Sequence, residues 1–145
     1  TRGMSSAASD VYKRQVYGRG VARYGLIHAD MRLANLLIDG GETRLIDFDD
    51  CGFGWFMYDF AAGISFMEEH PQVSALREAW LDGYRAVRPL DREDEVEIDS
   101  FIMLRRIALL AWTGSHAGTD LARSQAPHFA AGTARLAEAY LARFA

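Results

Sequence analysis

The feature that most restricts the fold is a pair of short apolar runs on either side of two glycines. Leu36-Leu37-Ile38 and Arg44-Leu45-Ile46 flank the segment Asp39-Gly40-Gly41-Glu42. Two brief runs around a Gly-rich turn are typical of a β-hairpin. A hairpin returns the chain to where the first strand began, so polar segments 28–35 and 47–49 are predicted to lie close together.

Those two polar segments hold residue types that phosphoryl transfer requires. His28-Ala29-Asp30 and Asn35 precede the predicted hairpin, and Asp47-Phe48-Asp49 follows it. Phosphoryl transfer to a hydroxyl needs a carboxylate that orients the hydroxyl and accepts its proton, together with oxygen ligands for Mg²⁺. Mg²⁺ takes only one or two carboxylates from a protein. A single aspartate in such a loop is more often a turn former or helix cap, so the prediction depends on the joint spacing.

The spacing also carries a family resemblance. His-x-Asp-x-x-x-x-Asn followed by Asp-Phe-x is similar to the catalytic and metal-binding loops of the protein-kinase superfamily. Ile46-Asp47-Phe48, with Asp59-Phe60 twelve residues later, resembles more closely the aminoglycoside phosphotransferase and choline-kinase-like family. The resemblance implies an α+β, mostly helical fold. It would be a protein-kinase-like C-terminal lobe with a short β-hairpin between the catalytic and metal-binding loops.

The resemblance implies a role for each residue that matches the family pattern. ATP and Mg²⁺ would be the cofactors. Asp30 would be the catalytic base, Arg32 a contact to the transferred phosphate, and Asn35 and Asp47 the ligands of the metal and nucleotide. His28, Asp49 and Asp59 would support the site, Asp59 through hydrogen bonds to the backbone of the catalytic loop. The family usually has glycine where Ala29 stands, which we treat as a small change.

The ends of the chain differ in character. Residues 1–15 contain the only lysine, Lys13, in a stretch that resembles a translated sequencing adapter, and we predict a non-native or disordered tail. Residues 16–145 would form the kinase-like lobe, with the catalytic loop at 26–38, the metal loop at 45–60 and a helical substrate subdomain at 60–145. No Gly-rich phosphate loop precedes the motif, so we expect the 145-residue chain alone to be inactive.

The helical region is predicted from its periodicity and punctuation. Apolar residues recur every three or four positions over Val73–Val87, and Arg88-Pro89 should end that helix. The acidic stretch 91–99 leads into a buried helix over Phe101–Trp112, residues 114–125 form a loop, and residues 129–144 form a last helix.

Several charged and aromatic residues of this region are candidates for the acceptor side. Glu68, Glu69 and the acidic run 93–99 are either an acidic wall for a cationic acceptor or a solvated helix start. Arg105 and Arg106 lie within an apolar helix, so at least one must leave the core or find a carboxylate. Trp112 and His116 are packing residues or line a pocket.

The function predicted from these observations is an ATP-dependent phosphotransferase that acts on a small-molecule hydroxyl of the aminoglycoside or amino-alcohol type. Two kinase alternatives are a stress-response-type protein Ser/Thr kinase and a homoserine-kinase-like enzyme. Alternatives of other classes are a kinase-like binding module without catalysis and a metal-dependent hydrolase, for which the extra His or Asp ligands are missing. The partners are a nucleotide and a hydroxyl-bearing acceptor.

Composition restricts partners and location. The net charge of −4 provides no basic surface for a nucleic acid. No apolar run approaches the roughly 20 residues that span a membrane. The single cysteine, Cys51, cannot form a disulfide within the chain, so we expect a reducing, cytoplasmic setting.

Overall fold

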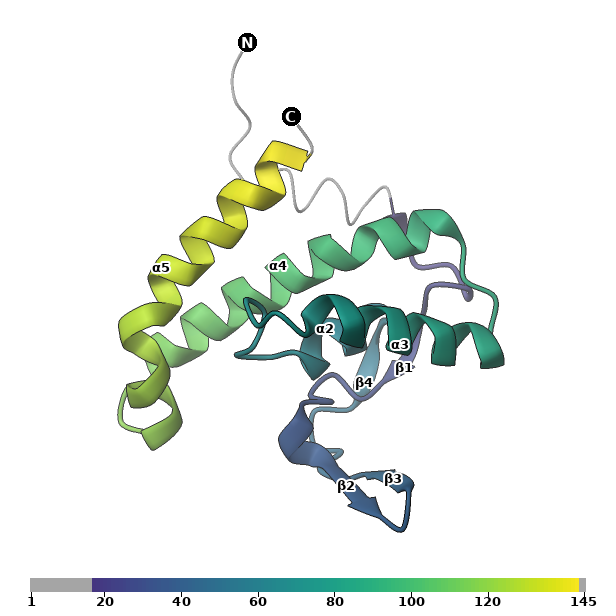
Figure 1. The fold of residues 1–145 in the computed structure, drawn as a ribbon, viewed down its shortest axis with the longest axis horizontal. Coiled ribbons are helices and arrows are strands. Elements are labelled where there is room, and N and C mark those ends of the chain that lie inside the picture. Colours follow the sequence, from purple (N-terminus) through teal and green to yellow (C-terminus); the bar gives the residue numbers. More distant parts are fainter. Residues whose placement is uncertain (1–16, 144–145) are drawn as a thin grey trace.

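The computed structural model describes residues 17–143, and the predicted tail at 1–15 lies outside them. Within these residues two small antiparallel sheets are followed by helices (Figure 1). The elements in chain order are β1 (Tyr24–Ile27), the 3₁₀ helix η1 (Leu33–Asn35), β2 (Leu36–Asp39), β3 (Glu42–Leu45), β4 (Gly52–Trp55), α2 (Tyr58–Gly63), α3 (Val73–Val87), α4 (Arg92–Ser115) and α5 (Asp120–Arg143). The mostly helical α+β class is therefore confirmed.

The strands form two separate pairs. β2 and β3 pair as an antiparallel hairpin, with Leu36 opposite Leu45 and Asp39 opposite Glu42. Gly40 and Gly41 have φ angles of 56° and 90°, the left-handed values that a two-residue hairpin turn requires and glycine adopts without strain. The hairpin extends away from the helices (Figure 1). β1 pairs antiparallel with β4, a pairing between distant segments that the sequence analysis did not predict.

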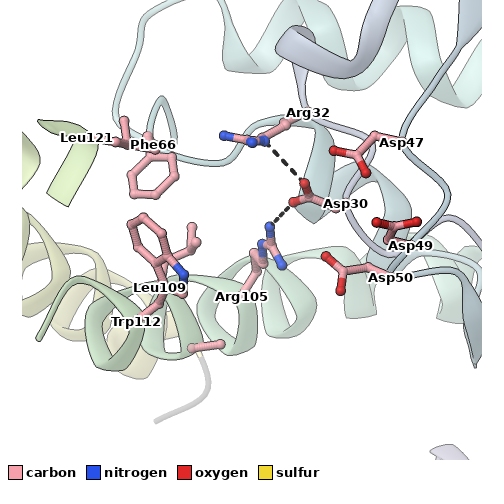
Figure 2. A pocket seen from close by; sticks show the side chains of 11 residues that line it. Asp30, Arg32, Asp47, Asp49, Asp50, Phe66, Arg105, Leu109, Trp112 and Leu121 are labelled. Atoms are coloured by element: carbon pink, nitrogen blue, oxygen red, sulfur yellow. Dashed lines mark hydrogen bonds and ion pairs between the residues drawn. The ribbon is translucent and has the colours of Figure 1, made fainter. Parts of the chain in front are cut away.

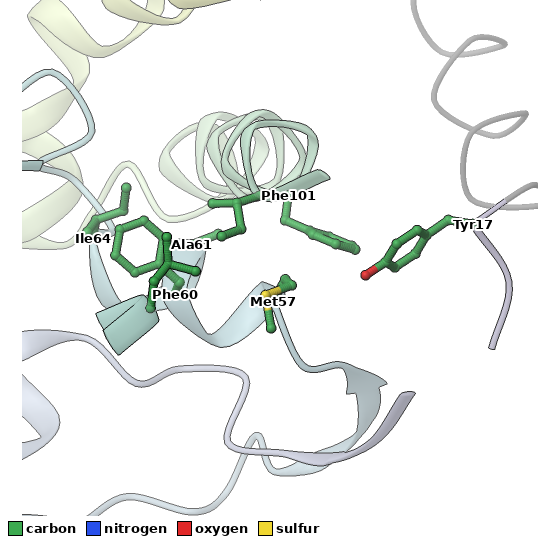
Figure 3. Packing of buried hydrophobic residues seen from close by; sticks show 8 residues of the cluster. Tyr17, Met57, Phe60, Ala61, Ile64 and Phe101 are labelled. Carbon is green, nitrogen blue, oxygen red and sulfur yellow. The ribbon is translucent and has the colours of Figure 1, made fainter. Parts of the chain in front are cut away.

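The hydrophobic core lies where α2 meets α3 and α4 (Figure 3). Phe60 and Ala61 of the short helix α2 and Ile64 directly after it are almost completely buried, and they meet Leu81 from α3 and Ile98 and Phe101 from α4. Trp55, Phe56 and Met57, which precede α2, also pack against this cluster. The strands are covered much less, since Leu26, Ile38 and Phe53 remain exposed.

The helix boundaries agree with the sequence in one place and differ in another. α3 spans the predicted residues, and Arg88 at its end is extended, as expected for a residue before proline. The predicted loop at 114–125 is wrong, because α4 continues to Ser115 and α5 begins at Asp120, with Pro127 inside it. None of the helices between residues 17 and 143 is long and apolar enough to cross a membrane.

Candidate functional site

Four of the residues predicted to act together border one cleft of about 500 Å³ (Figure 2): Asp30, Arg32, Asp47 and Asp49. His28, Asn35 and Asp59 lie outside its lining. Asp30 and Arg32 come from the loop after β1, and Asp47, Asp49 and Asp50 come from the segment after the hairpin. The opposite wall is one face of α4, from Arg105 to Trp112, together with Phe66 and Leu121. Figure 2 shows the three aspartates on one side of Asp30 and the aromatic and apolar residues on the other.

Asp30 is held by three side chains. Its Oδ1 pairs with Nη2 of Arg105 at 2.5 Å. Its Oδ2 accepts hydrogen bonds from Nε of Arg32 and Nδ2 of Asn35, both at 3.1 Å. The side chain is only 15% exposed, so the carboxylate faces the cleft in a fixed orientation. A carboxylate fixed in this way is suited to orient a hydroxyl group.

The backbone around Asp30 is fixed by Asp59. The two carboxylate oxygens of Asp59 accept hydrogen bonds from the backbone N–H groups of His28 and Ala29, at 3.0 and 2.8 Å. Ala29 has a φ of 65°, a left-handed conformation that glycine adopts more easily than alanine. The exchange of glycine for alanine at this position is therefore small in volume but places alanine in a strained backbone conformation.

His28 connects the two functional segments. Its ring is buried and bonds through Nε2 to the backbone oxygen of Ile46 at 3.0 Å, and it packs 4.9 Å from the Phe48 ring. The N–H of Ile46 also donates to the backbone oxygen of Asn35 at 3.1 Å. The two hydrogen bonds to Ile46 bring the loop at 28–35 next to Asp47.

The donor set suits Mg²⁺. Both hydrogen bonds of the Asn35 amide nitrogen go to Asp30, which leaves the amide oxygen for a metal. Asp47, at a φ of 65°, is exposed and has no hydrogen bond or ion pair with a described residue. No group of three or more His, Cys, Asp or Glu residues able to hold a metal occurs among residues 17–143. A site with few protein ligands, completed by phosphate oxygens, is typical of Mg²⁺ rather than Zn²⁺.

Asp49 and Asp50 lie at the same end of the cleft. Both are exposed, and neither makes a hydrogen bond or ion pair with another described side chain. Asp49 was predicted to support the site; it borders the cleft with Asp30 and Asp47 but forms no side-chain hydrogen bond or ion pair with a residue between 17 and 143. Asp50, to which the sequence analysis gave no role, also borders the cleft.

Arg105 is a residue of the site to which the sequence analysis assigned no role beside Asp30. It lies 75 positions from Asp30 and also donates from Nε to Oγ of Ser65 at 3.0 Å. Burial lowers the pKa of the Arg105 guanidinium, but the hydrogen bond and charge of Tyr58 and the charge of Asp30 outweigh that effect and raise it overall. The signal in the sequence was an arginine pair in an apolar helix, both members of which find carboxylates.

The acidic residues proposed as an acceptor wall have arginine partners instead. Glu68 pairs with Arg106 in the interior, and Glu69 pairs with Arg106 and Arg135. In the run 93–99, the paired carboxylates are those of Glu93, Asp94, Glu95 and Asp99, whose partners are Arg23, Arg77, Arg85 and Arg143. None of these acids borders the cleft around Asp30. Trp112 lines the cleft, whereas His116 stacks on the Trp112 ring outside it.

Comparison with known proteins identifies the family. Residues 14–93 match the model of the phosphotransferase enzyme family (APH). A homoserine kinase of Neisseria meningitidis is 39% identical over 75 residues, which cover 49% of this chain and 25% of that protein. An amicoumacin kinase of Bacillus subtilis is 30% identical over 95 residues, which cover 59% and 28%. The chain therefore belongs to the phosphotransferase enzyme family.

Solved structures extend the similarity over nearly the whole chain. A microcompartment-associated aminopropanol kinase superimposes with a TM-score of 0.82 and 45% identity, covering 97% of this chain and 47% of that one. An amicoumacin kinase solved with AMP-PNP and Ca²⁺ superimposes with a TM-score of 0.62 and 26% identity, covering 92% and 44%. The chain thus spans between a quarter and a half of the length of these relatives.

Proposed function

We propose that the protein containing this chain transfers the γ-phosphate of ATP to a hydroxyl group of a small molecule. The observation that carries the proposal is the convergence of Asp30, Asn35 and Asp47, with Asp30 oriented into a cleft that Asp47 also borders. Membership of the phosphotransferase enzyme family and the similarity to kinases of small hydroxyl compounds support it.

In the proposed reaction the acceptor hydroxyl lies against Asp30. The carboxylate orients the hydroxyl and receives its proton as the hydroxyl oxygen bonds to the γ-phosphorus and the bond to the ADP oxygen breaks. Asn35 and Asp47 would hold Mg²⁺, which would neutralise the charge that develops on the phosphates. Arg32, two residues after the base, would contact the transferred phosphate. His28 and Asp59 keep the loop in place through the hydrogen bonds described above.

The walls of the cleft favour a small acceptor with an apolar body. Beyond Asp30, on the side away from the aspartates, the cleft is bordered by Phe66, Leu109, Trp112 and Leu121 (Figure 2). A polycationic aminoglycoside would need carboxylates there, and those of Glu68, Glu69 and the run 93–99 are elsewhere. We therefore favour a short amino alcohol or a hydroxy amino acid as the acceptor over an aminoglycoside. A hydroxy amino acid is the acceptor of the homoserine-kinase-like alternative.

We further propose that the chain corresponds to a kinase-like C-terminal lobe. The catalytic loop at 26–38, the metal loop at 45–60 and the helical part at 60–145 would provide the acceptor and metal side of the site. The exposed apolar residues of β1, β2 and β4 support the view that these strands pack against further protein, and the isolated chain is expected not to turn over ATP. Turnover by the isolated chain that Asp30→Ala abolishes would contradict this.

The test is a transfer assay on the complete protein that contains this sequence. Mg²⁺ and ATP are supplied with aminopropanol, homoserine, amicoumacin or an unstructured Ser/Thr peptide, and ADP and the phosphorylated product are both measured. We expect transfer to one of the two smallest acceptors and its loss in Asp30→Asn and Asp47→Asn. The matched control is Asp82→Asn, since Asp82 is an exposed carboxylate of α3 away from the cleft. ATP binding without transfer to any acceptor would favour a non-catalytic binding module, and transfer to the peptide alone would favour a protein kinase.

A further inference from the structure

We propose that Arg105 is a positioning residue that holds Oδ1 of Asp30, so that Oδ2 is the oxygen that receives the acceptor proton. This inference rests on the proposed function. It adds Arg105 of α4 to the site and gives the two carboxylate oxygens of Asp30 different roles.

Both carboxylate oxygens of Asp30 already accept hydrogen bonds from neighbouring side chains. Oδ1 faces Arg105, and Oδ2 accepts from Arg32 and Asn35. If Asp30 is to orient the acceptor, the acceptor hydroxyl must hydrogen-bond to one of these two oxygens. Because Oδ2 already accepts two hydrogen bonds, one of its two donors must withdraw before the acceptor hydroxyl can bond to it.

The contacts show which donor is fixed. Besides Asp30, the guanidinium of Arg105 donates to Oγ of Ser65 at 3.0 Å and lies 3.5 Å from the backbone oxygen of Ala29 and the hydroxyl of Tyr58. Its side chain is 15% exposed. Arg105 therefore connects α4 and Ser65, in the turn after α2, to the loop that carries the base.

Arg32 is held much less firmly. Its side chain is 34% exposed, and Asp30 is its only hydrogen-bond or ion-pair partner among the described residues. The two arginines border the same cleft, so Arg32 is able to turn toward an incoming phosphate without breaking any other contact. Its departure frees a position on Oδ2, while Arg105 keeps Oδ1 and the orientation of the carboxylate unchanged.

The expected effect of losing Arg105 follows from the sensitivity of the reaction to placement. A displacement of about 1 Å costs roughly 100-fold in rate, and phosphoryl transfer depends almost entirely on positioning and electrostatics. In the complete protein we expect Arg105→Ala to lower kcat by about 100-fold while KM for the acceptor changes by less than about 3-fold. Arg105→Lys should recover only part of kcat, because an ammonium lacks the planar fork that contacts Asp30 and Ser65 together.

The matched control is Arg77→Ala. Arg77 is also a partly buried arginine, with a side chain 20% exposed that pairs with Asp99 at 2.8 Å, but it does not border the cleft. This variant should lose stability without loss of kcat. Guanidinium ion added at millimolar concentration should restore part of the kcat of Arg105→Ala and have no such effect on Arg77→Ala, which separates positioning of the base from a merely structural contribution.

The outcomes distinguish this inference from the proposed function. No transfer by the wild-type protein to any acceptor overturns both. With an active wild type, an unchanged kcat in Arg105→Ala overturns the positioning role alone, and so does a loss confined to KM, which would place Arg105 on the acceptor itself. If Arg105→Ala does not fold, Arg105→Lys decides the matter, since full activity in that variant overturns the role of the planar fork.

Discussion

Backbone strain in this chain is found beside the functional side chains. Ala29 directly precedes Asp30, and Asp47 comes shortly after the hairpin. Both residues have a φ angle of 65°. Left-handed backbone is unfavourable for residues with a Cβ and persists only where surrounding contacts impose it. At Ala29 the contacts that impose this conformation are two hydrogen bonds. The backbone N–H groups of His28 and Ala29 donate them to the Asp59 carboxylate. Strain at this position therefore serves to present Asp30 to the cleft.

Ala29→Gly is expected to stabilise the 145-residue chain by about 1 kcal/mol, because glycine adopts this conformation without the Cβ penalty. The hydrogen bonds of residue 29 are made by its backbone and are retained. Urea unfolding measures the change. The control is Ala79→Gly in the middle of α3, which should lose about 1 kcal/mol. Equal losses in both variants would contradict the argument.

At the residue scale, the sequence predicted the members of the site that lie within one motif. Asp30, Asn35 and Asp47 are close in sequence, and the hairpin between them determines their proximity. The contact between Arg105 and Asp30 could not be predicted, because it depends on how α4 packs on α2, which no local sequence pattern specifies. The acidic run 93–99 was ambiguous for the same reason, since its arginine partners come from other elements.

Elements are joined by ion pairs as well as by the apolar core. Arg106 of α4 pairs with Glu68 in the interior, with their side chains 4% and 0% exposed, and donates to Oγ1 of Thr133 and the backbone oxygen of Phe129 in α5. Gly132 allows this approach, since a Cβ there would lie 2.6 Å from Nη2 of Arg106. The cluster fastens α5 to α4 and to the loop after α2.

Arg106→Met should lower the free energy of unfolding by about 3–5 kcal/mol, because it leaves the Glu68 carboxylate buried without a compensating charge. Adding Glu68→Met should recover much of that loss, since the second change removes the charge itself. Urea unfolding of the parent, the two single variants and the double variant gives a double-mutant cycle, which measures the coupling free energy between Arg106 and Glu68. Arg123→Met, which removes a pair between exposed side chains, should change stability by less than about 1 kcal/mol. A double variant less stable than Arg106→Met would contradict the prediction.

Element boundaries were predictable where local chemistry determines them. The apolar spacing and Pro89 correctly delimit α3. Residues 114–125 were predicted as a loop, but Gly114 lies within α4, and α5 begins at Asp120 and continues through Pro127. Packing between the two long helices outweighs the cost that glycine and proline carry in a helix. The β1–β4 pairing was missed because its partners are distant segments whose register is set by tertiary contacts.

At the scale of the whole molecule, Tyr17 connects the segment before β1 to the start of α4. Its ring is buried against Phe101, and its hydroxyl donates to Oδ1 of Asp94 at 2.8 Å. Arg23 pairs with the same Asp94 oxygen at 2.7 Å. Burial, together with the hydrogen bond and charge of Asp94, raises the pKa of the Tyr17 phenol well above its ordinary value of 10.0. Burial likewise raises the pKa of Tyr84.

These shifts predict how global stability depends on pH. A group whose pKa is higher in the folded state stabilises the fold fully below its unfolded pKa, about 10 for a phenol, and this stability is lost as the pH rises above that value. Above pH 10 the unfolded chain releases phenolic protons that the folded chain keeps. The free energy of unfolding should then fall by up to about 1.4 kcal/mol per pH unit through the Tyr17 phenol.

Tyr17→Phe tests this prediction in urea unfolding measured from pH 7 to pH 11. Between pH 7 and 9 the free energy of unfolding of the variant should stay about 1 kcal/mol below that of the parent, because the hydrogen bond to Asp94 is lost. Asp94 keeps its ion pair with Arg23. Above pH 10 its stability should fall less steeply, since one titrating phenol is gone, and the two curves should converge. Curves that remain parallel up to pH 11 would show that Tyr17 does not retain its proton on folding. The attachment of this segment to α4 would then not depend on the neutral phenol.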